Sequence, residues 1–283
     1  MSFKYPFSIK KSVNTVIPLL KKYGIVHIPN YLTKKNIKIL NVEFEKSLDG
    51  NWKSVYAQSA HPTNTNGRAA RFNPWQKNAK DEFPKMTSVY QDPFMKEVAD
   101  AYYSPYKYSF NEAVFITHEL PCDIPILPWH YDRVQALKFW FNLSDTTKKD
   151  GAFEYCPGTH WEGHFRAGYY LSQGVSIEEL PNDIDPDLIL NPVTIELKAG
   201  DLLIFDPDGF HRGGIVEKGG ERRVLRGHTY PQGRRYGDKL FSPGWWLKTP
   251  LNMNRIVKNA TSRVIGENIS DKSVNRYHHD ISK

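Results

Sequence analysis

Three residues of the sequence could together hold a metal ion. His130 and Asp132 stand two residues apart in Trp129-His130-Tyr131-Asp132, and on a strand this spacing puts an imidazole and a carboxylate on the same face. His211 is the best candidate for a third ligand, because it follows the apolar run DLLIF after a turn that contains Pro and Gly. Two histidines and one carboxylate on one face of an iron ion leave open positions, which is the arrangement of non-haem Fe(II) oxygenases.

An arginine eleven residues beyond His211 could bind a second group. Arg222 opens the last β-type run of the sequence, and a guanidinium beside such a metal can hold one end of a dicarboxylate through two parallel hydrogen bonds. The other end of that acid would chelate the metal. Arg223 is the alternative, because neighbouring residues of a strand point to opposite faces.

Other histidines and the two cysteines have more ordinary interpretations. His160, in Pro-Gly-Thr-His, is interpreted as a structural residue of a turn, whereas the roles of His164 and His228 stay open. Cys122 and Cys156 are too few for a disulfide framework. Two free thiols favour a reducing, cytoplasmic compartment.

Short β-type runs separated by Pro, Gly, Asn and Asp turns fill the middle of the chain and predict a sandwich or jelly roll. Before them we expect a helix that ends at Gly24, a short strand, a helix capped by Thr33 and another helix over 92–103. Residues 51–85 are polar and aperiodic, which predicts a long loop that could serve as a lid. The β-type runs cover residues 111–119, 136–143, 151–155, 193–197, 201–205 and 222–230.

The composition limits the classes of protein that the chain can belong to. Of its 283 residues, 40% are hydrophobic and 24% are charged, which excludes a collagen-like or low-complexity protein. No apolar run approaches the roughly 18 residues of a membrane span. The formal net charge is +7, and residues 231–283 hold 10 Lys and Arg against 4 Asp and Glu. A basic tail could contact nucleic acid, but no basic run is dense, so nucleic-acid binding is not favoured.

Four segments match the motifs of a known family, in that family's order. They are the opening KKYGIVHIPNYLTKKNI, the strand WHYD, the segment LSDTTKKDGAFEYCPGTHWEGH, and AGDLLIFDPDGFHRGGIVEKGGERR. Together they resemble the phytanoyl-CoA dioxygenase family of Fe(II)/2-oxoglutarate-dependent oxygenases. Any one segment is a weak signal, whereas four in order make a specific one.

The resemblance implies an α+β fold with a double-stranded β-helix (jelly-roll, cupin-like) core and flanking N-terminal and C-terminal helices. We expect one oxygenase domain over residues 1–283. Helical support would occupy residues 1–107, and the jelly-roll core would span about 108–230 with an insertion over 160–190. A C-terminal extension would follow over 231–283.

The resemblance also implies roles for the site residues. His130, Asp132 and His211 would bind Fe(II), with 2-oxoglutarate and O2 as cosubstrates. Arg222 would bind the distal carboxylate of 2-oxoglutarate, since the family's arginine stands eleven residues past its second histidine. Trp140 would lie near the cosubstrate.

The expected reaction is the oxidation of a small molecule with release of succinate and CO2. Related halogenases lack the carboxylate that Asp132 supplies, so hydroxylation, desaturation or cyclisation is expected. The family often has Gln where Tyr131 stands, which leaves a cosubstrate contact at that position open. Basic residues near the expected mouth favour an anionic substrate, with Arg133 as a candidate contact. They are Arg68, Arg71, Lys77, Arg133, Arg166 and Arg226.

Two other functions stay open at this point. The oxygenase could act on a nucleic acid or a protein, for which only the basic C-terminal region speaks. The chain could also be a non-catalytic, cupin-like metal-binding module, against which the complete ligand set and the arginine speak. The sequence does not decide between a monomer and a homodimer.

Overall fold

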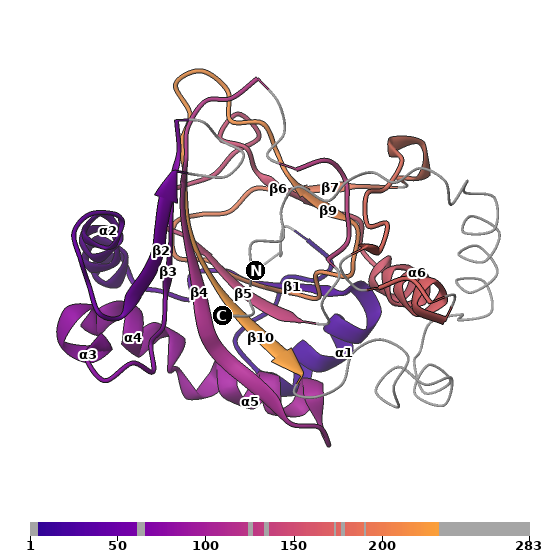
Figure 1. Cartoon of the computed structure of the whole chain (residues 1–283), viewed down its shortest axis with the longest axis horizontal. Coiled ribbons are helices and arrows are strands. Elements are labelled where there is room, and N and C mark those ends of the chain that lie inside the picture. Colours follow the sequence, from indigo (N-terminus) through magenta and orange to yellow (C-terminus); the bar gives the residue numbers. More distant parts are fainter. Residues whose placement is uncertain are drawn as a thin grey trace.

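Two antiparallel sheets form the centre of the structure, and helices cover the outer face of the larger one (Figure 1). The larger sheet has the strand order β1-β8-β5-β10-β4-β3-β2 and the smaller sheet the order β7-β6-β9. These two sheets make the predicted jelly-roll core. The structure is a computed structural model that describes residues 5–60, 66–123, 127–132, 136–172, 174–176, 179–189 and 191–231.

The helices and strands alternate in the first part of the chain, and strands dominate after residue 108. The helices are α1 (Val13–Tyr23), α2 (Lys34–Leu48), α3 (Ala79–Glu82), α4 (Pro84–Tyr90), α5 (Pro93–Tyr103), α6 (His160–Ser172) and the 3₁₀ helix η2 (Pro186–Leu188). The strands are β1 (Ile25–Ile28), β2 (Val55–Ala60), β3 (Arg68–Phe72), β4 (Tyr108–Glu119), β5 (Leu137–Asn142), β6 (Phe153–Tyr155), β7 (Val193–Ile195), β8 (Leu202–Phe205), β9 (His211–Gly213) and β10 (Arg222–Pro231).

The predicted helix boundaries are confirmed, and each has a local cause. Helix α1 ends at Gly24, whose φ of 74° lies in the left-handed region that glycine adopts without strain. Helix α2 begins after Thr33, whose side chain accepts a hydrogen bond from the Asn36 amide. Asp92 caps α5 in the same way. These caps fix where the helices start and stop on the outer face of the sheet.

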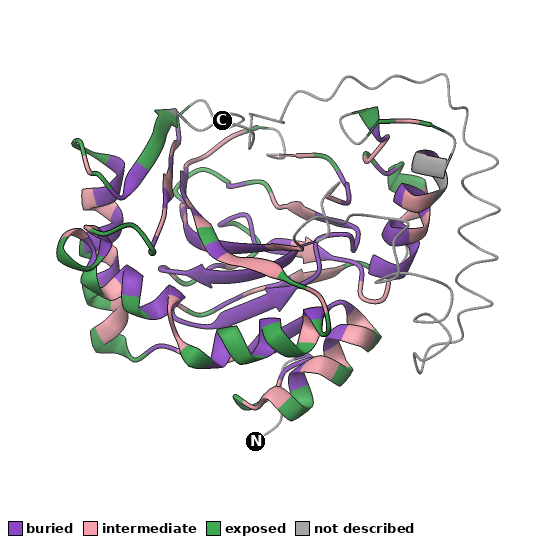
Figure 2. Cartoon of the chain, turned by 60° about the horizontal axis from the view of Figure 1, so that its bottom comes forward, coloured by how far each residue is buried: buried purple, intermediate pink, exposed green. Residues whose placement is uncertain are grey.

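Side-chain alternation along the strands separates two apolar cores. In β8, Leu202 and Ile204 pack into the core shared with the helices, whereas Leu203 and Phe205 pack into a second core between the sheets. Figure 2 shows the buried sheet between partly exposed layers. Burying one such Leu or Phe side chain contributes about 1.5–3 kcal/mol. The inner face, which carries the candidate site, is therefore held in place from both sides.

Residues 51–85 correct one of our expectations. They do not form a long loop: β2, β3 and α3 lie within them, and residues 61–65 are outside the described part. Strand β3 pairs with β4 along its whole length, and its Ala70 and Phe72 are buried against the helices. Ala69 and Arg71, which alternate with them, are small or polar and face the space between the sheets. That mixture hid the period-two pattern.

Two further predictions cannot be compared with the structure. The C-terminal extension beyond Pro231 and the candidate contact Arg133 lie outside the described residues. None of the described helices is long and apolar enough to cross a membrane.

Candidate metal centre

His130 and His211 are brought together by main-chain pairing. The His130 amide donates to the His211 carbonyl over 3.1 Å, and the His211 amide donates back over 2.8 Å. Their ring centroids are 4.3 Å apart. His211 opens β9, whereas the predicted strand at WHYD is only a short bridge at His130, which also pairs with Asp183. The two histidines thus meet although 80 residues separate them in sequence.

Both imidazoles are oriented by carbonyl groups of their own chain segments. Nδ1 of His130 lies 2.8 Å from the Pro128 carbonyl, and Nδ1 of His211 lies 2.8 Å from the Gly209 carbonyl. Because a carbonyl only accepts, Nδ1 carries the proton in both rings. Nε2 is then the atom with the free lone pair, as a metal ligand requires.

Asp132 completes the group. Its Oδ1 lies 3.6 Å from Nε2 of His130 and 3.6 Å from Nε2 of His211, and the three ligand atoms lie within 4.8 Å of one another. The Asp132 side chain is 24% exposed, more than either histidine, so the site opens on the carboxylate's side. This donor set, two imidazoles and one carboxylate, fits a non-haem iron centre.

The charges around the group favour the ligand forms. Burial raises the pKa of Asp132, but Lys138 and the two histidines outweigh burial and hold it well below its usual value. Burial and repulsion from His130 hold the pKa of His211 well below its usual value. At neutral pH the carboxylate is therefore ionised and the His211 ring is neutral, the forms that bind metal.

Lys138 is a functional candidate that our sequence reasoning missed. Its Nζ contacts Oδ2 of Asp132, the oxygen that does not face the histidines, and its side chain is 6% exposed. It projects from the inner face of β5, the strand that also carries Trp140. A lysine within the apolar run ALKFWF was the available signal, because buried charges are rare unless paired.

Arg222 and Arg223 lie on opposite faces of the larger sheet. Arg223 reaches outward and pairs with Glu45 of α2 at 3.0 Å. Arg222 is buried on the inner face, where its guanidinium pairs with Glu119 of β4 and donates to the Gly151 carbonyl. Of the two arginines, only Arg222 faces the space between the sheets that holds the metal candidate.

Trp140 lies beside Arg222 on the inner face. The Arg222 guanidinium carbon is 5.9 Å from the Trp140 ring centroid, and the indole N–H donates to the Asn142 side chain over 2.6 Å. Tyr131, by contrast, is buried in a separate cluster, and its hydroxyl donates to the Pro181 carbonyl. The structure therefore places Trp140, and not the Tyr131 hydroxyl, next to the candidate arginine.

Comparison with known proteins decides the family. The model of the phytanoyl-CoA dioxygenase (PhyH) family matches residues 20–224. This chain belongs to the phytanoyl-CoA dioxygenase family. The predicted family, fold class and enzyme class, a 2-oxoglutarate-dependent non-haem iron enzyme, are thereby confirmed. A search of curated protein sequences finds no match.

Solved structures of similar fold agree with membership of the PhyH family. The chain is similar to the non-haem, α-ketoglutarate-dependent epimerase SnoN of nogalamycin biosynthesis, with 16% identity, a TM-score of 0.55, and coverage of 81% of this chain and 88% of that one. It is similar to the carbocyclase SnoK of the same pathway (17%, TM-score 0.53, 76% and 82%). It is also similar to HygX of Streptomyces hygroscopicus, solved with nickel and 2-oxoglutarate (13%, TM-score 0.51, 77% and 86%). At these identities the likeness shows the fold.

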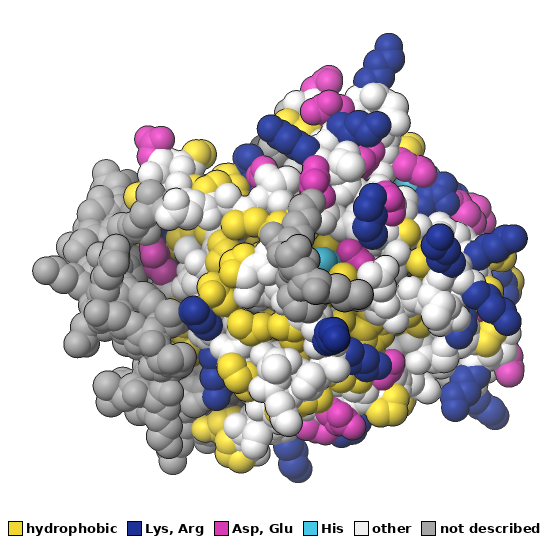
Figure 3. Space-filling view, turned by 180° about the vertical axis from the view of Figure 1, so that it is seen from behind, with side chains coloured by type: hydrophobic (Ala, Val, Ile, Leu, Met, Phe, Trp, Pro, Cys, Tyr) yellow, Lys and Arg dark blue, Asp and Glu magenta, His cyan; other side chains and the backbone are white. Residues whose placement is uncertain are grey.

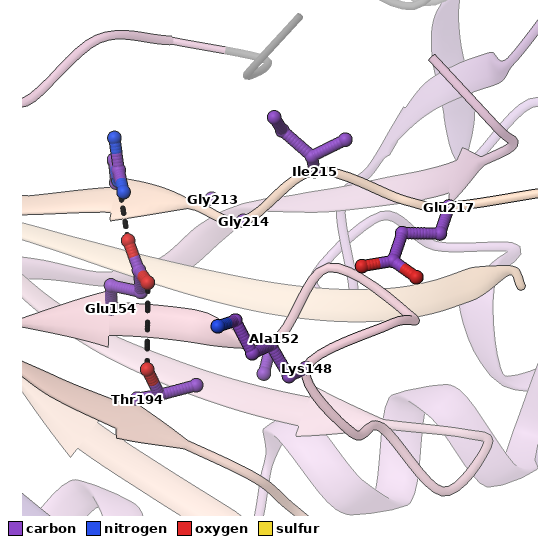
Figure 4. Close-up of a pocket in the computed structure, with 9 residues that line it drawn as sticks. Lys148, Ala152, Glu154, Thr194, Gly213, Gly214, Ile215 and Glu217 are labelled. Carbon is purple, nitrogen blue, oxygen red and sulfur yellow. Dashed lines mark hydrogen bonds and ion pairs between the residues drawn. The ribbon is translucent and has the colours of Figure 1, made fainter. Parts of the chain in front are cut away.

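In this PhyH-family protein the two histidines of the site are buried and Asp132 is partly exposed. Figure 3 shows one face of the molecule, on which Lys and Arg side chains surround a central area of hydrophobic ones. A different pocket, with an empty volume of about 500 Å³, lies on the smaller sheet and is lined by residues that include Lys148, Thr194 and Glu217 (Figure 4). Its Glu154 pairs with Arg212 and accepts from Thr194. These groups satisfy one another on the face of β9 opposite His211, so we assign that pocket no role in the chemistry.

A second cluster of buried side chains, His164, Asp206 and Asp208, stabilises the turn that precedes His211. Nε2 of His164 lies 3.2 Å from Asp206 and 2.8 Å from Asp208, and the Tyr102 hydroxyl donates to Asp206 over 2.6 Å. The three side chains have ligand spacing, but an imidazolium between two carboxylates explains the geometry without a metal. A side chain in place of Gly163 would collide with the Asp208 carbonyl at 1.9 Å, so α6 packs directly on this turn.

We expect this second cluster to make the protein less stable at alkaline pH. Burial lowers the pKa of His164, but Asp206 and Asp208 outweigh burial and raise it to about 10. A raised pKa stabilises the folded state fully below the unfolded value of about 6.5 and loses that effect as pH rises through about 10. The urea concentration at which half of the protein is unfolded should therefore decrease as the pH is raised from about 6.5 to about 10. In a His164→Gln/Asp208→Asn variant this fall should be smaller, and an unchanged slope would contradict the assignment.

We also expect Lys138 to affect metal affinity. A Lys138→Met change keeps the apolar stem and removes the ammonium group that contacts Oδ2 of Asp132, so the carboxylate loses its fixed orientation. Affinity for Co(II), followed by its visible absorption, should fall about 10–100-fold. The matched control is Lys198→Met, which removes a surface pairing with Asp145. Equal Co(II) affinity in the two variants would contradict a positioning role for Lys138.

Proposed function

We propose that this chain is an Fe(II)- and 2-oxoglutarate-dependent oxygenase that hydroxylates, desaturates or cyclises a small, anionic molecule, with release of succinate and CO2. One observation carries the proposal: Nε2 of His130, Nε2 of His211 and Oδ1 of Asp132 converge within 4.8 Å, with both Nδ1 atoms committed to carbonyls. We assign His130, Asp132 and His211 as the residues that would hold the metal. Bound iron supplies the oxidising chemistry that no side chain of this chain can supply.

Arg222 is our candidate for holding the distal carboxylate of 2-oxoglutarate. Glu119 contacts its Nε and Nη2, and the Gly151 carbonyl accepts from Nη1. Since a guanidinium has five N–H groups, two remain for a carboxylate. Glu119 and Gly151 also fix the plane of the group before the cosubstrate arrives, which lowers the ordering cost of binding. Trp140 would cover one side of the same space.

We propose a small substrate because proteins of similar fold were solved with small molecules bound. SnoN was solved with nogalamycin RO and HygX with hygromycin B. The inner face, which carries aromatic side chains such as Trp140 and Phe115, suits a ring-bearing or apolar body with few polar groups. A cytoplasmic location stays a prediction that rests on the two free cysteines.

The proposal is tested by product formation. The protein is incubated in air with Fe(II), ascorbate and 2-oxoglutarate, with and without a panel of small acids, and succinate is measured. We expect slow succinate formation without substrate and faster formation with an accepted acid. A product heavier by one oxygen would identify hydroxylation, and a loss of two hydrogens would identify desaturation or cyclisation. No succinate under any of these conditions would favour a non-catalytic metal-binding module.

A further inference from the structure

Two arginines differ from the others in the described part of the chain. Arg68, Arg166, Arg212, Arg222 and Arg223 each have a carboxylate within 4.0 Å. Arg71 and Arg226 have none among the described residues. Both side chains are half-buried rather than fully exposed. A guanidinium that is partly removed from water without a counter-charge costs free energy, which an anionic ligand would recover.

These two arginines lie in one row across the inner face of the larger sheet. Strand pairing places Arg71 of β3 opposite Phe115 of β4, Phe115 opposite Arg226 of β10, and Arg226 opposite Trp140 of β5. The guanidinium carbons lie 4.7 Å (Arg71) and 5.4 Å (Arg226) from the Phe115 ring centroid. One aromatic ring therefore holds both cations in position.

The row adjoins the metal candidate. On the next inner-face row, His228 of β10 stands opposite Lys138 of β5, and Lys138 contacts Asp132. His228 stacks on Phe115 at 4.2 Å and accepts a hydrogen bond from Nε of Arg226 over 2.9 Å. That contact uses one donor of Arg226 and leaves its two terminal nitrogens without an acceptor among the described residues.

Lys138 and Arg222 are not available for the same purpose. The charge of Lys138 is opposed by Asp132, and Arg222, which also contacts Glu119, is the residue that we propose for the 2-oxoglutarate carboxylate. Arg71 and Arg226 are thus the cations of this face that have no described carboxylate within 4.0 Å, although Asp132 and Glu119 attract Arg226 from farther away. Planar guanidinium groups bind carboxylate and phosphate oxygens through paired hydrogen bonds.

We propose that Arg71 and Arg226, supported by Phe115, form an anion-binding pair that holds the acidic group of the substrate beside the metal centre. This inference rests on the proposed function, because it assigns the substrate class of that same site. The acidic group would be a carboxylate or a phosphate. The rest of the substrate would then extend along the inner face toward Asp132.

The test measures anion binding directly. Inorganic phosphate and acetate are titrated by calorimetry into protein loaded with Ni(II) and 2-oxoglutarate, so that the metal and Arg222 are already engaged. The variants are Arg71→Gln, Arg226→Gln and both together. Arg68→Gln is the matched control, because Arg68 lies on the same strand, faces outward and pairs with Glu45 and Asp49.

We expect the unchanged protein to bind at least one of the two anions, with an affinity that falls as salt is added. Each single variant should weaken binding about tenfold and the double variant should abolish it, whereas Arg68→Gln should change it less than about twofold. Tighter binding of phosphate than acetate would indicate a phosphorylated substrate, and the reverse a carboxylic acid.

Two outcomes would overturn the inference. They are anion affinity in the double variant equal to that of the unchanged protein, and no anion binding by the unchanged protein. Folding is checked by thermal melting, and the double variant should melt close to the parent, since neither arginine forms an ion pair with a described carboxylate. Succinate formation by the unchanged protein tests the oxygenase proposal separately, so the two ideas can fail independently.

Discussion

An Asp132→Ala variant should lose both metal binding and 2-oxoglutarate turnover. The change removes one of three ligand atoms that lie within 4.8 Å, and substitutions outside the ligand shell alone cost about 10–100-fold in metal affinity. We therefore expect Co(II) affinity to fall by more than about 100-fold. Succinate formation should fall below detection in the same preparation.

The controls for this variant separate a lost ligand from a damaged fold. Asp132→Ala leaves the buried Lys138 without its carboxylate, so an Asp132→Ala/Lys138→Met variant restores the charge balance. Asp145→Ala removes a surface carboxylate that pairs with Lys198 at 2.7 Å, and it should bind Co(II) like the parent. Normal Co(II) binding by a folded Asp132→Ala protein would show that the metal is held elsewhere.

Replacing Arg222 should have the second large effect. In Arg222→Gln the buried Glu119 loses its partner, and removing one member of a buried pair costs about 3–5 kcal/mol of stability. The variant should also need a much higher 2-oxoglutarate concentration, about 100-fold, for half-maximal succinate formation, because a bidentate charged contact is lost. Urea unfolding and a 2-oxoglutarate titration measure the two effects.

A double variant distinguishes the two roles of Arg222. Arg222→Gln/Glu119→Gln removes both buried charges and should recover most of the stability. It should not recover 2-oxoglutarate affinity if Arg222 is the anchor. If stability and 2-oxoglutarate affinity both recovered, Arg222 would serve only to neutralise Glu119, and another group would bind the cosubstrate.

The sequence predicted structure correctly at positions where the residue type has a well-defined local role, such as a helix cap or a place in an alternating strand. A strand that begins with Arg222 and Arg223 must send one inward and the other outward, and Gly24 and Thr33 have clear roles at helix ends. Motif order supplied the convergence of His130 and His211, which periodicity alone does not give. The metal candidate and the jelly roll therefore followed from the sequence together with the resemblance.

Pairing across the structure was not predictable in the same way. Glu119 has its role through Arg222, which lies 103 residues away in the chain, and Lys138 has its role through a contact with Asp132 that strand periodicity does not predict. Strand β2 lies at the edge of the larger sheet and β3 lies between β2 and β4, and both have polar or small inner-face residues, so the sequence alone did not indicate strands. His164 was left open because nothing local indicates that α6 delivers it between two aspartates.

The carbonyls that hold the two imidazoles belong to Pro128 and Gly209, each two residues before the histidine that it orients. No neighbouring side chain is needed to select the tautomer of either ring. Residues on the surrounding walls, such as Arg71, Phe115 and Arg226, can then be exchanged without disturbing how the rings point. In such a protein, substitutions around the site can change the substrate while the orientation of the two histidines stays the same.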